Sequence, residues 1–69
     1  MAIDTSAWAA EHSAALVGLP AAAAEQEGED AGLRARIAGP GVMLTLEFRT
    51  DRITLLTDDG GIVIEVRAG

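Results

Sequence analysis

Hydrophobic residues recur with a helical period in the first half of the chain and with a strand period in the second half. Trp8, Ala15 and Leu16 lie at helical spacing, which predicts a helix that turns these three side chains toward the core. Polar residues at positions 4–6 suit its N-cap, and Gly18 suits a left-handed stop after Leu16. The sequence therefore predicts a first helix from about residue 4 to residue 16.

A second helix is predicted from about Pro20 to Ala31, because proline is favoured in a first helical turn. One side of this helix carries small residues, and the other side is strongly acidic. The small residues at helical spacing are Ala21, Ala24, Gly28 and Ala31. Gly28 costs up to about 1 kcal/mol of helix propensity, so a close approach to the sheet is expected there. Gly32 is the expected C-terminal stop.

Three strands are predicted in the second half, at residues 33–37, 53–57 and 62–66. Residues 58–61, Asp-Asp-Gly-Gly, form a hairpin signal, so the last two strands should pair antiparallel. Helices followed by strands indicate an α+β fold: N-terminal helices packed on a small mixed β-sheet. Residues 1–69 are expected to form a single domain, with 1–15 as an N-terminal helical extension.

The segment between the first two strands, from Ala38 to Asp51, is unusually long for so small a domain, and such segments are usually functional. Its residues 42–48 favour extended conformations, as a peptide does in a protease cleft. Leu46 offers an apolar anchor for a hydrophobic specificity pocket. The guanidinium groups of Arg49 and Arg52 are placed to hydrogen-bond loop carbonyls and the Glu47 carboxylate.

Composition excludes several other classes. The chain has 69 residues, a net charge of −6 from 11 acidic and 5 basic residues, no cysteine and one histidine. An acidic chain is a poor partner for nucleic acid or for an anionic membrane. A single histidine without cysteine makes a metal site unexpected, and no cofactor motif is present. No apolar run approaches a membrane span, and the N-terminal residues do not have the pattern of a signal peptide.

Several short motifs resemble a known group of proteins. They are Leu16-Val17-Gly18, then Gly41, then Thr45-Leu46-Glu47-Phe48-Arg49-x-Asp51-Arg52, then Asp58-Asp59-x-Gly61 and a final Gly69. In this order they resemble the potato type I proteinase inhibitors, and more closely their bacterial and fungal relatives, the peptidase inhibitor family seventy-eight. The resemblance covers about residues 16–69 and includes the whole predicted sheet.

The resemblance implies an α+β wedge whose loop, residues 39–51, binds subtilisin-, chymotrypsin- or elastase-type serine proteases like a substrate. Leu46 would be the residue before the scissile bond (P1), and Glu47 the residue after it (P1′). Thr45 would be P2, and Arg52 would support the loop from below. The protease-binding residues implied in this way are Leu44, Thr45, Leu46, Glu47, Phe48 and Arg49.

The sequence departs from the family pattern in three places. Potato-type members often carry a second supporting arginine where this chain has Thr54. Microbial relatives often carry a cysteine where this chain has Ala68, and the plant-type ending is shortened to residues 66–69. A non-inhibitory interaction module that uses the same loop or a sheet edge is therefore an alternative hypothesis.

Other features have ordinary interpretations. His12 is read as a helix-surface residue, because no Ser-His-Asp constellation follows from the spacing, and no enzymatic activity is expected. Asp58 and Asp59 lack the alternating oxygen ligands of a calcium loop and are read as a solvated turn. The chain as written is expected to be cytoplasmic, or secreted if an upstream leader was removed.

Overall fold

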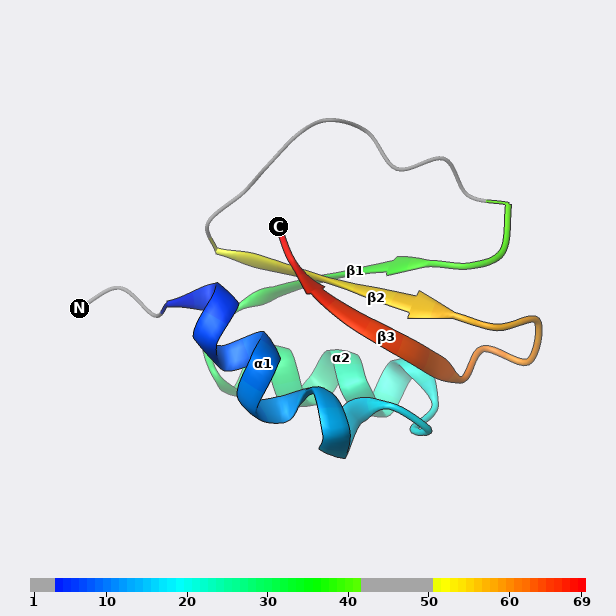
Figure 1. Ribbon diagram of the computed structural model, residues 1–69, viewed down its shortest axis with the longest axis horizontal. Coiled ribbons are helices and arrows are strands. Elements are labelled where there is room, and N and C mark those ends of the chain that lie inside the picture. The colour runs from blue at the N-terminus through cyan, green and yellow to red at the C-terminus, as the bar shows by residue number, and fades with distance from the viewer. Residues whose placement is uncertain (1–3, 42–50) are drawn as a thin grey trace.

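The computed structural model describes residues 4–41 and 51–69. Two helices precede three strands along the chain (Figure 1). Their bounds are α1 Thr5–Leu16, α2 Ala21–Asp30, β1 Arg34–Ala38, β2 Arg52–Thr57 and β3 Val63–Ala68. The predicted α+β class is confirmed, and each predicted element is present within one or two residues of its expected limits.

The three strands form one mixed sheet in the order β1-β2-β3. β1 and β2 are parallel, with Arg34 beside Arg52 and Arg36 beside Thr54. β2 and β3 are antiparallel, and the register shifts between Leu56 and Thr57. Figure 1 shows both helices on the same face of the sheet. The other face, which we call the outer face, carries neither helix.

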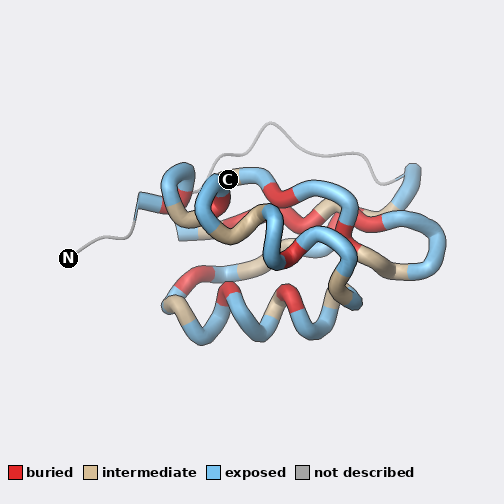
Figure 2. Tube along the Cα trace, turned by 60° about the horizontal axis from the view of Figure 1, so that its bottom comes forward, coloured by how far each residue is buried: buried red, intermediate tan, exposed pale blue. Residues whose placement is uncertain are grey.

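The core lies between the helices and the sheet, where most of the buried positions in Figure 2 meet. Ile53 and Leu55 of β2 are fully buried at its centre. α1 packs mainly on β3 and α2 mainly on β1, so the two helices together cover the sheet. Alternation along β2 turns Thr54, between these two core residues, toward the outer face.

Capping at both ends fixes the limits of α1. The Asp4 carboxylate accepts a hydrogen bond from the Ala7 backbone N–H at 3.2 Å, which satisfies one of the free donors of the first turn. After Val17, Gly18 has a positive φ of 95°, as predicted for the stop. The Gly18 N–H then donates to the Val63 carbonyl and joins this turn to β3.

The face of α1 that meets the core differs from the predicted one at one position. Leu16 is buried and Trp8 packs half-buried against the core, both as expected, but Ala15 is exposed. Ala9 and Thr5 take the remaining inward positions. Ala9 lies seven residues before Leu16, which is two helical turns, whereas Ala15 is rotated by about 100° from its neighbour Leu16. In an alanine-rich helix the sequence pattern gives little contrast between faces, and the assignment of Ala15 to the core was wrong.

Gly28 allows α2 to approach the sheet closely, as the sequence predicts. A Cβ atom at this position would lie 2.9 Å from Cδ1 of Ile53 and 3.9 Å from Cβ of Ala35. Gly28 and Ala24 are both buried on the face of the helix that meets the sheet. The loss of helix propensity at Gly28 is thus offset by burial of the Ile53 side chain against the helix backbone.

Gly28→Val is expected to lower the free energy of unfolding by about 1–3 kcal/mol, the usual range for overpacking a close-packed core. The new side chain meets Cδ1 at the end of the fully buried Ile53 side chain, so Ile53 must shift within the close-packed core. Ala23→Val is the matched control, because Ala23 is exposed on the same helix. Urea denaturation of both variants measures the difference, and equal losses would contradict the close approach.

The turn between β2 and β3 has the expected Asp-Asp-Gly-Gly sequence. Its backbone is closed by Asp58 N–H to the Ile62 carbonyl at 2.9 Å. The Asp58 carboxylate also accepts hydrogen bonds from the N–H groups of Gly60 and Ile62 at 2.9 and 3.0 Å. Asp58 is therefore a turn-forming residue whose oxygen atoms are used inside the hairpin, in keeping with the interpretation of this pair as a turn.

Candidate functional site

Most of the predicted site lies outside the described residues. Leu44, Thr45, Leu46, Glu47, Phe48 and Arg49 fall in the range 42–50, and their assignments stay predictions. Arg52 is described and is the first residue of β2. The structure also describes the two flanks of this range and the face of the sheet beside them, and these are the parts that define the frame of the site.

Parallel pairing of β1 and β2 places the two flanks at opposite ends of the sheet. The chain leaves β1 at Ala38, beside Leu56, and enters β2 at Arg52, beside Arg34 (Figure 1). Parallel neighbours always require a connection that returns along the length of the strands. Both described helices precede β1, so neither of them makes this connection. The connection falls on residues 39–51, most of which lie outside the described residues.

The second flank is fixed to the sheet at Asp51. The Arg34 backbone N–H donates to the Asp51 carbonyl at 2.8 Å, which holds Asp51 at the start of the parallel β1-β2 ladder. The Arg34 guanidinium also lies 3.7 Å from the Asp51 carboxylate, measured from Nε to Oδ2. Both side chains are more than half exposed, so this ion pair adds little to stability. The backbone bond is the anchor.

The outer face of the sheet is basic, although the chain as a whole is acidic. Four of the five basic residues lie there, Arg34 and Arg36 on β1, Arg52 on β2 and Arg67 on β3, and Glu65 on the same face of β3 pairs with Arg67. The fifth, Arg49, lies outside the described residues. α2, on the opposite face, carries four of the acidic residues. Net charge alone hid this separation, and only the strand register reveals it.

Arg52 lies beside a small hydrogen-bonded cluster at the start of β2. The Gly69 N–H donates to the Arg52 carbonyl at 2.7 Å, and the Thr54 hydroxyl donates to the Gly69 carbonyl at 2.6 Å. The Arg52 Nε atom is buried. Thr54 itself is buried although it points away from the helices. This part of the outer face is therefore shielded from solvent.

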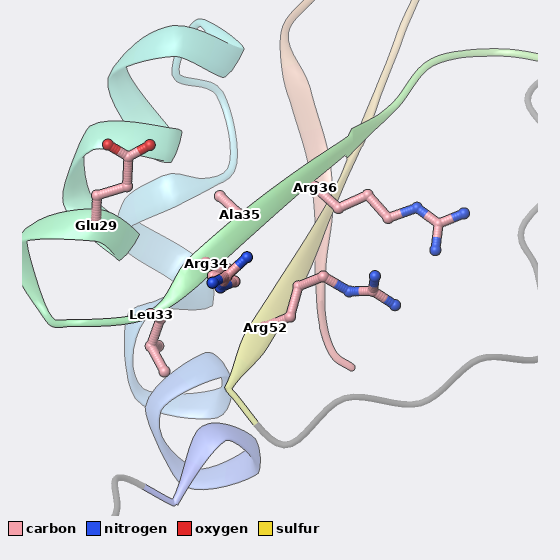
Figure 3. A pocket seen from close by; sticks show the side chains of 6 residues that line it. All are labelled: Glu29, Leu33, Arg34, Ala35, Arg36 and Arg52. Carbon is pink, nitrogen blue, oxygen red and sulfur yellow. The ribbon is translucent and has the colours of Figure 1, made fainter.

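An open pocket of about 530 Å³ runs along the edge of the sheet beside β1 (Figure 3). It is lined by Glu29, Leu33, Arg34, Ala35, Arg36 and Arg52. Figure 3 shows the Arg36 and Arg52 side chains reaching to the same side of the sheet, away from α2 and Glu29. The sequence predicts a role for Arg52 but not for Arg36, because the two residues become neighbours only through parallel pairing.

Other candidate chemistry is absent from the described part of the chain. No group of three or more metal-ligating side chains occurs within residues 4–41 and 51–69. His12 stacks on Trp8 with ring centroids 4.2 Å apart, and its Nδ1 lies 2.9 Å from the Trp8 carbonyl oxygen, so the ring packs along α1. Among the described helices, none has the length and apolar character needed to cross a bilayer.

Two solved structures that match this fold, two helices on one face of a three-stranded mixed sheet, are small protein inhibitors of proteases. One solved structure with this fold is the bitter gourd trypsin inhibitor, which is 36% identical. The match has a TM-score of 0.67 and covers 80% of this chain and 85% of the inhibitor. Another is the fungal elastase inhibitor AFUEI, 19% identical, with a TM-score of 0.72 over 96% of each chain.

The second likeness establishes the fold alone, whereas the first adds clear sequence similarity over most of both chains. No protein-family model matches the chain, and no curated protein sequence matches it significantly. Both structural neighbours are inhibitors rather than enzymes. The predicted general class, a small α+β protease inhibitor fold, is supported at this level.

Proposed function

We propose that the chain inhibits a serine protease by placing residues 42–50 in the enzyme's cleft as a substrate would lie. In this proposal Leu46 is P1, the side chain that enters the specificity pocket, and Glu47 is P1′. The proposal includes the finer resemblance to the potato type I inhibitors and to the peptidase inhibitor family seventy-eight. The observation that carries it is the fold shared with two protease inhibitors.

The frame described above supports this proposal. Binding to a cleft in extended form costs ordering entropy, unless the segment is already held at both ends. Here β1 precedes the segment and the Asp51 carbonyl is bonded to Arg34 immediately after it. If the enzyme cuts the peptide bond, both new ends stay attached to one folded domain. Their effective concentration is then high, and religation competes with release.

A panel of subtilisin, chymotrypsin, elastase and trypsin tests the proposal. We expect inhibition of at least one protease that prefers an apolar P1 residue, with little effect on trypsin, because trypsin requires a basic P1 side chain. Mass analysis after long incubation should find slow cleavage at one bond only, after Leu46. Rapid cleavage at several bonds, without inhibition of any protease in the panel, would contradict the proposal that the chain is an inhibitor. Clean cleavage elsewhere would retain the class but reject Leu46.

A further inference from the structure

β1 lies at one edge of the sheet and presents main-chain hydrogen-bonding groups there. The Arg34 N–H donates to the Asp51 carbonyl, so Arg34 turns its main-chain groups toward β2. Successive residues of a strand present these groups to opposite sides, and Ala35 and Ile37 therefore present theirs to the outside of the sheet. Within residues 4–41 and 51–69, the sheet order β1-β2-β3 places no strand beyond this edge.

The opposite edge of the sheet is partly closed by the turn after α1. The Gly18 N–H donates to the Val63 carbonyl at 2.8 Å, and the Val63 N–H donates to the Leu19 carbonyl at 2.9 Å. The Ala21 N–H continues this pairing to the Gly61 carbonyl. The chain itself thus covers the start of β3, and in the described part of the chain β1 is the more open edge.

The pocket beside β1 has the lining that an added strand requires. Arginines line it on the outer face of the sheet, and Leu33 and Ala35 line it on the helix side. Glu29 of α2 borders it on the helix side as well (Figure 3). Farther along the same edge, Ile37 is 43% exposed, whereas its register partner Leu55 on β2 is fully buried. An extended peptide in this position would cover Ile37 and pair with the main chain of β1.

Charge along this edge indicates which kind of peptide would bind. The Arg34 side chain is 73% exposed, and its Nε lies 3.7 Å from the Asp51 carboxylate. Arg36 follows two residues later on the same face and also takes part in polar or electrostatic interactions. A strand added beside β1 places every second side chain next to these arginines, where acidic groups form favourable cross-strand pairs. The intervening side chains lie beside Ala35 and Ile37, where apolar groups fit.

The same arginines disfavour a second copy of this chain as the occupant. Antiparallel pairing that joins Ala35 of one copy to Ile37 of the other places the two Arg36 residues directly opposite each other. A shift by two residues toward the N-terminus places Arg34 opposite Arg36 twice. Like charges directly opposite each other destabilise a strand pair. A shift toward the C-terminus leaves only the Ile37 main chains hydrogen-bonded within the limits of both strands.

We propose that the β1 edge binds an extended acidic peptide as a fourth strand of the sheet. The peptide carries acidic side chains at alternate positions, which lie beside Arg34 and Arg36, and apolar side chains between them. Main-chain hydrogen bonds to Ala35 and Ile37 supply affinity, and the alternating side chains supply specificity. This site is separate from the proposed protease-binding segment, and the inference does not depend on the proposed function.

A blocked hexapeptide of alternating glutamate and valine is the probe, and a hexapeptide of alternating lysine and valine is its control. Titration of the glutamate peptide into the isotope-labelled chain should shift the amide NMR signals of Ala35 and Ile37 and slow their hydrogen exchange. The lysine peptide should bind at least about 10-fold more weakly, because it brings like charges to the arginines. Equal binding of both peptides, or shifts that avoid β1, would overturn the inference.

Arg34→Gln tests the charge contact. It should weaken binding of the glutamate peptide by about 3- to 10-fold, the effect expected for the loss of one charge-assisted contact. Arg67→Gln is the matched control, because it removes the same charge from the outer face on β3, at the opposite edge of the sheet. Equal losses in the two variants would mean that overall charge, rather than the β1 edge, attracts the peptide.

Ile37→Pro tests the main-chain contact. Proline removes an N–H that points away from β2, which an edge strand tolerates, and binding should fall by about 10-fold or more. Ile37→Val, which keeps the N–H, should bind like the parent, and the urea midpoints of both variants show whether they are folded. Binding unchanged in a folded Ile37→Pro would overturn strand addition. Sedimentation that shows a dimer of the parent, converted to monomer by Ile37→Pro, would assign the edge to a second copy instead.

Discussion

Leu46→Arg is expected to abolish inhibition of proteases with an apolar specificity pocket and to create inhibition of trypsin. An arginine side chain that enters an apolar pocket loses its hydration without gaining a counter-ion, and the cost reaches several kcal/mol. We therefore expect a loss of about 100-fold or more in affinity for the original protease. The affinity for trypsin, whose specificity pocket carries a carboxylate, should rise in the same variant. Inhibition constants for both enzymes measure this exchange.

The exchange of targets distinguishes P1 from its neighbours. Leu44→Arg is the matched control, because it introduces the same charge two residues earlier in the same segment. In an extended peptide, residues 44 and 46 point to the same side, yet only one of them enters the primary pocket. If Leu44→Arg produces the trypsin inhibition and Leu46→Arg does not, the register of the site is wrong by two residues.

The helices and strands can be predicted from the sequence because the local signals agree with the tertiary structure. Pro20 stands at the N-cap of α2, and Gly18 and Gly32 follow the two helices with positive φ. Alternation in the second half placed the strands, and the Asp-Asp-Gly-Gly turn predicted the antiparallel pair. These features depend on backbone sterics and on short-range hydrogen bonds, which a single sequence encodes directly.

Features that depend on contacts distant in sequence were missed. Ala15 was placed in the core because alanine is weakly apolar on every face of α1, and only packing against β3 selects Ala9 instead. From the sequence alone, Arg36 is only a charged position of an alternating strand. The parallel register brings it beside Thr54 on another strand. A basic face in an acidic chain likewise arises only when strands separated by the segment 39–51 are aligned.

Alternation of side chains along β2 couples the candidate site to the core. Arg52 and Thr54 lie on the outer face of the sheet, and Ile53 and Leu55 alternate with them along the same strand. Any loosening of the core beneath β2 therefore also displaces Arg52, the residue expected to support the loop. A small domain buries only about 60% of the surface that its unfolded chain exposes, so it has little stability in reserve.

Leu55→Ala should consequently lower the free energy of unfolding of the domain by a large part of its total. Leu55 is fully buried between the helices and the sheet, and truncating such a side chain costs about 2–5 kcal/mol. A 69-residue domain is stable by only about 3–10 kcal/mol in total, so the substitution removes much of its stability. Urea denaturation followed by circular dichroism measures the loss. Inhibition should fall together with the folded fraction.

Ile64→Ala is the matched control, because Ile64 is an aliphatic side chain on the adjacent strand that is 57% exposed. Its truncation should change stability by no more than about 0.5 kcal/mol. A Leu55→Ala variant as stable as Ile64→Ala would mean that the helices do not pack on β2 as described. A Leu55→Ala variant that is folded, resists cleavage and inhibits fully would contradict the proposal that β2 provides the rigidity of residues 42–50.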